Sequence, residues 1–255
     1  MRSLSTIRNR FLTLLAVAGA VCLSTAAAAQ TPAPPPDPPT DWTGSIGAGL
    51  SLTQGNNNTV NFSAAFDSVY DPKHGNVAKF TALFLRGKKD GELVVDRTSF
   101  GARDERTMSP RTFAFGQVDF LKDTFKQIDS LVSPNAGFGY KVVDSEATKF
   151  LVDAGAGAAW EKNPGIDTKV YGAITLDEKL TRQLTPTTTL KHAVSSLLKG
   201  NEPADGLYTV SLGLGVKINA RMQLSIDLLD SFKNRPPDAA KRNDVALITS
   251  IAAKY

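Results

Sequence analysis

The chain has 255 residues, of which 42% are hydrophobic and 21% are charged, and its formal net charge is +4. Three of the 29 basic residues and none of the 25 acidic residues lie in the first thirty positions, so the rest of the chain is close to neutral. This balance excludes the basic surface that nucleic-acid binding requires, and a single cysteine, Cys22, excludes a fold held together by disulfides within the chain.

The first 29 residues follow the order of a secretory signal peptide. A basic start precedes an apolar run over 11–23, which is too short for a membrane-spanning helix. Ala27 and Ala29 then supply the small residues of a cleavage site in front of Gln30. We therefore expect export and loss of residues 1–29, which would leave the mature chain without a thiol.

Residues 30–40 contain six prolines and predict an extended periplasmic linker that belongs to no core. The remaining stretch, 41–255, has the length of one domain. None of it is apolar for long enough to predict a transmembrane helix, so a place in a membrane would have to come from β-strands.

Apolar and polar residues alternate through most of this domain. Between Trp42 and Leu52 the even positions are mainly apolar and the odd positions are Gly, Ser and Thr, and the alternation recurs over 150–160, 208–218 and 222–228. A period of two predicts β-strands. Turn-forming residues separate these segments, and together they predict about twelve strands, near 42–53, 58–70, 77–87, 92–106, 111–121, 130–143, 148–161, 168–181, 186–198, 206–219, 221–233 and 243–255.

The polar faces of these strands are rich in Gly, Ser, Thr and Asn rather than in Lys and Glu, which favours a narrow lumen over a solvated surface. The sequence therefore predicts a closed antiparallel transmembrane β-barrel whose apolar side chains face lipid. Its outer links, such as 199–205 and 232–243, are expected to be longer than its inner links. Aromatic residues near the strand ends predict two interfacial girdles, formed by Trp42, Tyr70, Phe113, Tyr140, Trp160, Tyr171, Tyr208, Phe232 and Tyr255.

The carboxyl terminus carries a further sign of a membrane barrel. A terminal aromatic residue with mostly apolar alternate residues before it resembles the assembly signal that outer-membrane barrels present to their insertion machinery. An ordinary last strand is the alternative interpretation. The residues of the predicted signal are Leu247, Thr249, Ile251, Ala253 and Tyr255.

The opening of the domain is similar to that of the DUF481 family of YdiY-like, salt-induced outer-membrane proteins. The resemblance rests on WTGS at 42–45, GAG at 47–49 and QGNNNT at 54–59, with GFGY at 137–140 and GAG at 155–157 similar to later family segments. It implies an outer-membrane barrel with a role in salt or osmotic adaptation, and it implies no catalytic residues.

Nothing in the sequence predicts a catalytic, cofactor or metal site. His74 lies in a turn, and His192 cannot pair with Ser195 because residues three apart on a strand point to opposite faces. Ser196 shares the face of His192 but lies about 13 Å away at strand rise. Four glycine pairs lack the context of a dinucleotide site and are placed on the lumenal face, where glycine leaves room for opposite side chains: Gly47/Gly49, Gly137/Gly139, Gly155/Gly157 and Gly213/Gly215.

Charged residues fall mostly on the polar faces. Interior ion pairs are the favoured interpretation, and a charged lumen that selects solutes is the alternative, for the set Asp153, Glu161, Asp177, Asp227, Lys141, Lys169, Lys179, Lys191 and Lys217. A second set lies in or beside the outer loops, where it could bind lipopolysaccharide phosphates or be ordinary solvated charge: Lys88, Lys89, Lys122, Lys126, Lys199, Lys233, Arg235, Lys241 and Arg242.

The sequence thus predicts a monomeric barrel of the cell outer membrane, in contact with lipid and lipopolysaccharide and inserted by the barrel-assembly machinery. Its expected role is envelope structure or osmotic adaptation, and whether its lumen is a narrow pore stays open. The alternatives are a soluble periplasmic barrel that binds an apolar ligand and a lipid-modifying barrel enzyme.

Overall fold

The computed structural model describes residues 41–53, 59–236 and 241–255. The predicted signal peptide, its cleavage site at Ala27, Ala29 and Gln30, and the 30–40 linker lie outside the described residues. The strands are β1 Trp42–Thr53, β2 Thr59–Tyr70, β3 Asn76–Lys89, β4 Glu92–Thr107, β5 Thr112–Asp123, β6 Ile128–Asp144, β7 Thr148–Lys162, β8 Lys169–Gln183, β9 Thr188–Lys199, β10 Glu202–Lys217, β11 Met222–Lys233 and β12 Asn243–Lys254.

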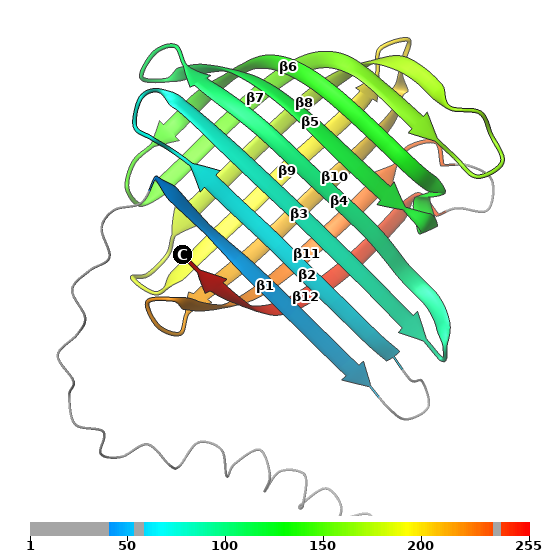
Figure 1. Cartoon of the computed structure of the whole chain (residues 1–255), viewed down its shortest axis with the longest axis horizontal. Helices are drawn as coiled ribbons and strands as arrows, with labels where there is room; N and C mark the ends of the chain where they lie inside the picture. The colour runs from blue at the N-terminus through cyan, green and yellow to red at the C-terminus, as the bar shows by residue number, and fades with distance from the viewer. Residues whose placement is uncertain (1–40, 54–58, 237–240) are drawn as a thin grey trace, which may run out of the picture. The chain divides into compact units, whose positions relative to one another are not determined.

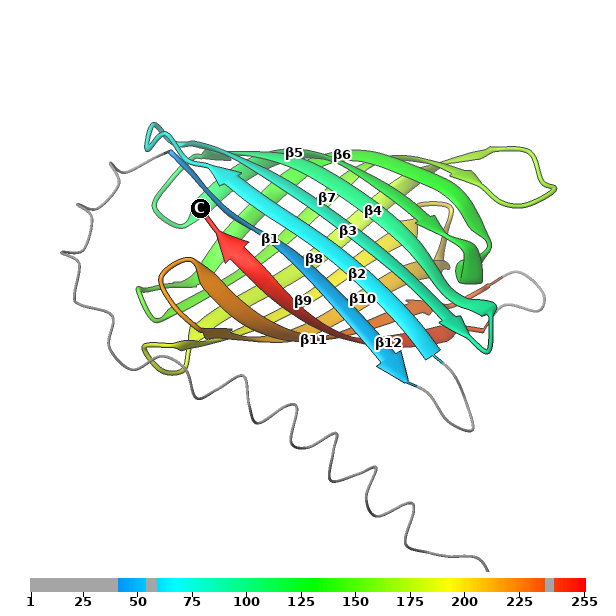
Figure 2. The same ribbon diagram turned by 60° about the horizontal axis from the view of Figure 1, so that its bottom comes forward.

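Each strand pairs antiparallel with its neighbours in sequence, and β1 also pairs with β12, so the sheet closes into a barrel (Figures 1 and 2). This is the predicted fold class, and every predicted strand is present. Pro134 does not mark a late strand start or a bulge, because it lies within β6, which begins at Ile128 and keeps its register with β5 there. On its other side, among the described residues, β6 has no register partner on β7 between Val132 and Asn135. A proline, which has no N–H to donate, is tolerated at such a gap in the pairing.

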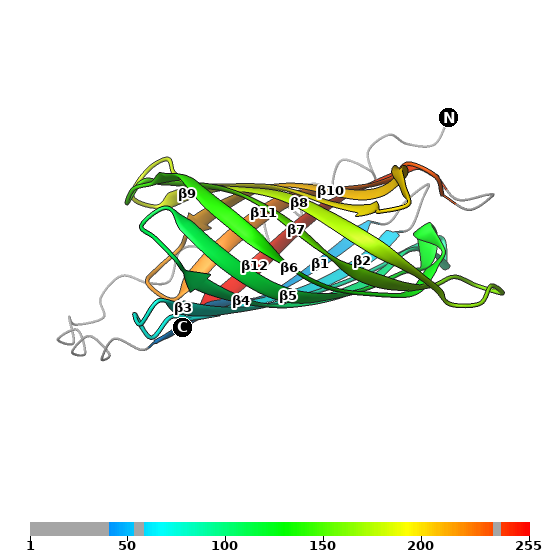
Figure 3. The same ribbon diagram turned by 90° about the horizontal axis from the view of Figure 1, so that it is seen from above.

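The strands run obliquely around the barrel (Figure 3), and their alternation separates an apolar outer face from a polar inner face. Ile46, Phe138 and Leu247 expose 59%, 67% and 71% of their surface on the outside, whereas Asn135 and Thr175 are buried inside. A soluble protein rarely exposes apolar side chains on this scale. The arrangement is that of a transmembrane barrel, and it argues against the soluble alternative.

Two of the nine aromatic residues expected at the membrane interfaces lie inside the barrel instead. Phe113 is buried against Gly139, and the Tyr171 hydroxyl donates a hydrogen bond to Glu161 at 2.9 Å. The residues opposite them on the neighbouring strands face the lumen. These two side chains therefore also point inwards and cannot contact lipid. The other seven are on the outer side, where girdle formation stays a prediction: Trp42, Tyr70, Tyr140, Trp160, Tyr208, Phe232 and Tyr255.

The connections do not show the expected difference in length between the two ends. The predicted long link over 199–205 is a two-residue turn at 200–201, after which the register of β10 shifts between Glu202 and Gly206. The turn between β3 and β4 is equally short, and both of its residues, Asp90 and Gly91, have positive φ. The 234–242 link does have the expected length, although part of it lies outside the described residues.

The β5–β6 link contains a 3-10 turn, η1, at Thr124–Lys126. Asp123 caps η1, because its carboxylate accepts hydrogen bonds at 3.2 Å from the backbone N–H groups of Phe125 and Lys126. This cap helps to hold the turn over the barrel and leaves Lys126 fully buried. In the described part of the chain, no helix is long and apolar enough to cross a membrane.

The last strand brings the chain terminus to the closure of the barrel. Tyr255 exchanges two backbone hydrogen bonds with Gly44 of β1, at 3.1 and 3.2 Å. Recognition of this end by an assembly machinery stays a prediction. The remaining residues of the predicted signal alternate onto the outer face, as it requires: Leu247, Thr249, Ile251 and Ala253.

Candidate functional site

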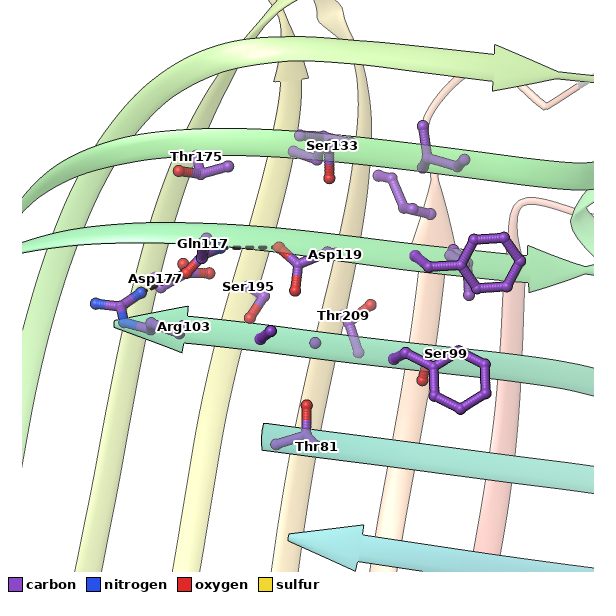
Figure 4. A pocket seen from close by; sticks show the side chains of 18 of the residues that line it. Thr81, Ser99, Arg103, Gln117, Asp119, Ser133, Thr175, Asp177, Ser195 and Thr209 are labelled. Carbon is purple, nitrogen blue, oxygen red and sulfur yellow. Dashed lines mark hydrogen bonds between the residues drawn. The ribbon is translucent and has the colours of Figure 1, made fainter. Parts of the chain in front are cut away.

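A cavity of about 400 Å³, called the lumenal cavity below, lies inside the barrel. Hydroxyl, amide and charged side chains from β3, β4, β5, β6, β8, β9 and β10 line it together with apolar side chains such as Leu121, Leu131 and Leu197 (Figure 4). The polar part of the lining suits water and small hydrophilic solutes, because each polar group needs a hydrogen-bond partner when it is removed from bulk solvent. The labelled residues are Thr81, Ser99, Arg103, Gln117, Asp119, Ser133, Thr175, Asp177, Ser195 and Thr209.

Arg103 connects two separate parts of the barrel wall near one end of this cavity. Its Nη2 lies 2.8 Å from Oδ2 of Asp153 on β7, and its Nε lies 2.8 Å from Oε1 of Glu105. Its Nη1 donates to the Gln117 side chain at 2.6 Å, and the guanidinium stacks 3.7 Å from the Phe115 ring centroid. The planar guanidinium can satisfy several acceptors at once, so it holds β4, β5 and β7 together.

Lys79 and the Phe113 ring lie beside these contacts. We call the whole group the Arg103 layer: Lys79, Arg103, Glu105, Phe113, Phe115, Gln117 and Asp153. Lys79 Nζ lies 2.7 Å from Glu105. The Phe113 ring fills the space over Gly139, where a Cβ would lie 2.0 Å from the ring. The predicted lumenal role of this glycine is therefore confirmed, and together these side chains fill the part of the lumen beside β3–β7, towards the end that holds the chain terminus.

A second charged group lies at the opposite ends of the strands and is called the Glu161 layer: Glu161, Asn163, Tyr171, Lys199, Asp205 and Lys233. Lys233 Nζ lies 2.6 Å from Glu161, whose carboxylate also accepts hydrogen bonds from Tyr171 at 2.9 Å and Asn163 at 3.2 Å. Lys199 pairs with Asp205 and lies 3.8 Å from Glu161. The layer thus joins β7, β8, β9 and β11.

Lys126 reaches across the same end of the barrel. Its Nζ lies 2.7 Å from Oδ2 of Asp244 on β12 and donates to the carbonyls of Lys241 and Arg242 at 3.1 and 2.7 Å. The β5–β6 link and β12 belong to opposite walls in the strand order of the closed barrel. Lys126 therefore ties two walls together, and we call this contact the Lys126 bridge.

The predicted interior ion pairs include Asp153 and Glu161, which are confirmed as members of the two layers. Their main partners, Arg103 and Lys233, were not predicted as such. Arg103 was not among the predicted interior charges, and its partner Asp153 lies fifty residues further along the chain. No local sequence signal identifies a pair formed across the lumen.

Three basic residues predicted to lie in or beside the outer loops, as lipopolysaccharide ligands or as solvated charge, point into the barrel instead. The strand ends and η1 turn these side chains inwards, where each forms an ion pair with a lumenal carboxylate: Lys126, Lys199 and Lys233. The exposed members of that set include Lys88, Lys89, Lys122, Lys241 and Arg242.

His192 takes no part in a serine–histidine pair. It lies on the outer face of β9, where its Nδ1 is 3.1 Å from Oε1 of Glu178. The Ser196 hydroxyl donates to the carbonyl of Leu176 at 2.8 Å. Among the described residues, no group of three His, Cys, Asp or Glu side chains could hold a metal ion.

Residues 46–255 match the model of a family described as "Protein of unknown function, DUF481". The chain belongs to the DUF481 family. No curated relative matches the DUF481 barrel by sequence.

Several solved outer-membrane proteins resemble the DUF481 barrel in fold. The COG4313 outer membrane channel from Pseudomonas putida F1 matches 86% of this chain and 97% of its own, with 13% identity and a TM-score of 0.49. The NanC porin matches 83% of this chain and 96% of its own, with 8% identity and a TM-score of 0.48. The KdgM porin matches 84% and 98%, with 6% identity and a TM-score of 0.44. Likenesses this distant carry no argument about solutes.

Proposed function

We propose that this DUF481 barrel lies in the outer membrane and offers small hydrophilic solutes a narrow passage that its own side chains obstruct. The carrying observation is the cavity of about 400 Å³ inside the barrel, where Arg103, Asp119 and Asp177 line the wall beside apolar side chains. A barrel filled completely by its own side chains would not keep a space of this size. Twelve strands give an interior between that of packed eight-stranded barrels and that of open porins.

Planar-bilayer conductance of the folded protein tests this passage. We expect small steps from the wild type and larger steps from Arg103→Ala, because removing the guanidinium clears the contact between β4 and β7. The double variant Arg103→Ala/Lys126→Ala should conduct more than either single variant, since the two obstructions lie in series. Arg182→Ala is the matched control, because this arginine is exposed on the outer face.

An envelope-structural role is the second candidate, and the Lys126 bridge favours it because this contact ties opposite walls together. In that case the double variant would lose stability without gaining conductance. Absence of steps from wild type, single and double variants alike, with all of them folded, would remove the proposed passage.

Salt or osmotic adaptation is the proposed physiological setting, in line with the resemblance to salt-induced outer-membrane proteins. A deletion strain should grow more slowly in high salt and recover with the wild-type gene. Equal growth with and without the gene would remove this part of the proposal.

We further propose a monomer surrounded by lipid, with lipopolysaccharide phosphates against exposed basic residues such as Lys88 and Lys122, and with the barrel-assembly machinery as its partner during insertion.

A further inference from the structure

The seam between the first and last strands is much shorter than the other strand pairings. β1 pairs with β2 along its full length, from Trp42–Tyr70 to Thr53–Thr59. Its pairing with β12 covers only the four residues from Ser45 to Ala48, with Tyr255 and Gly44 adding one further pair. The closure of the barrel is therefore complete at one end of the seam only.

The two strands separate just beyond Gly49. A Cβ at this position would lie 2.1 Å from the carbonyl oxygen of Thr249, so the backbones still touch there. In the described part of the chain, residues 50–53 of β1 and 243–248 of β12 have no register partner across the seam. Both segments remain fully paired on their other edges, with β2 and β11.

A cavity of about 490 Å³ lies at this unpaired part of the seam. Its lining includes Leu50 and Leu247, which expose 65% and 71% of their surface on the outer face. The same lining includes Ser63 and Leu85, which face the lumen. This cavity is bounded by residues of both faces, so it lies within the wall of the barrel at the place where the strand pairing is lost.

Further cavities lead from the seam towards the lumen. The seam cavity shares Leu85, Val95, Val245 and Ala246 with a smaller cavity of about 110 Å³. Arg97 lines this smaller cavity and also the lumenal cavity. The seam cavity has a mixed lining that includes Leu50 and Leu247, and the smaller cavity contains Arg97 together with the carboxylates of Asp123 and Asp244.

One N–H group of Arg97 has no hydrogen-bond partner at that point in the described part of the chain. Its Nη1 lies 3.2 Å from Oδ2 of Asp123. Its Nε is buried and has no hydrogen-bond partner among the described residues. A buried donor without a partner is unfavourable, so an acceptor that entered through the seam would be stabilised there.

We infer that the β1–β12 seam is a lateral opening through which the acyl chain of a carboxylate-bearing, single-chain amphiphile enters the barrel wall from the membrane. The apolar residues of the seam cover the chain, and Arg97 receives the head group. An open strand edge in hydrocarbon is unfavourable unless something covers it or it borders a water-filled space. An occupant of the seam supplies that cover. This inference goes beyond the proposed polar passage and rests on different residues.

The test uses the folded, full-length mature barrel in liposomes and a fluorescent fatty acid as the probe. Ser51→Cys/Ile248→Cys places thiols at positions that would be opposite each other if the pairing continued. Gly47→Cys/Ala252→Cys is the matched control, because a Cβ at 47 lies 3.3 Å from the Cβ of Ala252, close to the spacing in a disulfide. We expect rapid disulfide formation in the control and little in the seam pair.

A short bifunctional thiol reagent then closes the seam in Ser51→Cys/Ile248→Cys. We expect saturable probe binding to the wild type and to the cross-linked control, and binding about tenfold weaker after the seam is cross-linked, which corresponds to about 1.4 kcal/mol. Arg97→Gln should weaken the fatty acid but not the matching fatty alcohol. Equal disulfide rates in the two pairs, no saturable binding to the wild type, or unchanged binding after seam cross-linking would each overturn the inference.

Discussion

At the scale of single residues, the packing of the lumen depends on where a large side chain lies over a glycine. Phe113 packs over Gly139 and near the Arg103 guanidinium, whose carbon lies 5.7 Å from the ring centroid. The sequence placed glycine on the lumenal face correctly but assigned Phe113 to a lipid girdle. An aromatic residue one position off the apolar face looks like a girdle residue until the register fixes its direction.

Gly139→Val tests this packing. A side chain at 139 would collide with the Phe113 ring, and overpacking of this kind should cost about 1–3 kcal/mol of unfolding free energy. Urea unfolding in liposomes measures the loss. Gly116→Val is the control, because a Cβ there meets nothing within 4 Å. Equal stabilities of the two variants would show that the ring does not depend on Gly139.

At the scale of elements, each strand was predictable because its alternation is local and its two faces meet different surroundings. The connections were less predictable than the strands. The composition of 199–205 is typical of a loop, yet β9 and β10 pair up to Lys199 and Glu202 and leave a turn of only two residues. Lys126 was read as a loop cation because nothing local shows that η1 turns it inwards. Propensity describes a segment by itself, whereas a hydrogen-bonded neighbour can extend a strand into turn-rich sequence.

The last strand gives a prediction at this scale. Tyr255→Ala keeps the backbone hydrogen bonds to Gly44 but removes the terminal aromatic ring of the proposed assembly signal. We expect slower insertion in cells and a severalfold lower amount of folded protein, measured by heat-modifiable gel migration. Tyr70→Ala, another outer-face aromatic, should have a smaller effect. If both variants insert at the wild-type rate, the last strand is an ordinary strand.

At the scale of the whole molecule, the barrel has an apolar exterior and a charged interior. The apolar side chains need hydrocarbon around them, and the charged layers gain strength from being shielded from bulk water. In water alone the outer face of such a molecule would associate with other apolar surfaces.

This arrangement predicts how the protein fractionates. Detergent should be required to extract it from envelope membranes, and the unboiled protein should migrate faster on a gel than the boiled protein because the closed barrel stays compact. Recovery of the folded protein in the soluble periplasmic fraction would contradict a membrane location and return the soluble alternative.

The sequence by itself determined the closed barrel, its strand positions and the direction of most side chains, because a period of two is written into neighbouring residues and only one face can be apolar. The tertiary structure decided which charges meet. Arg103 and Asp153 are fifty positions apart, and Lys126 and Asp244 come from opposite walls. It also decided the short β1–β12 seam, because closing a ring depends on the summed tilt and register of all its strands, which no single segment carries.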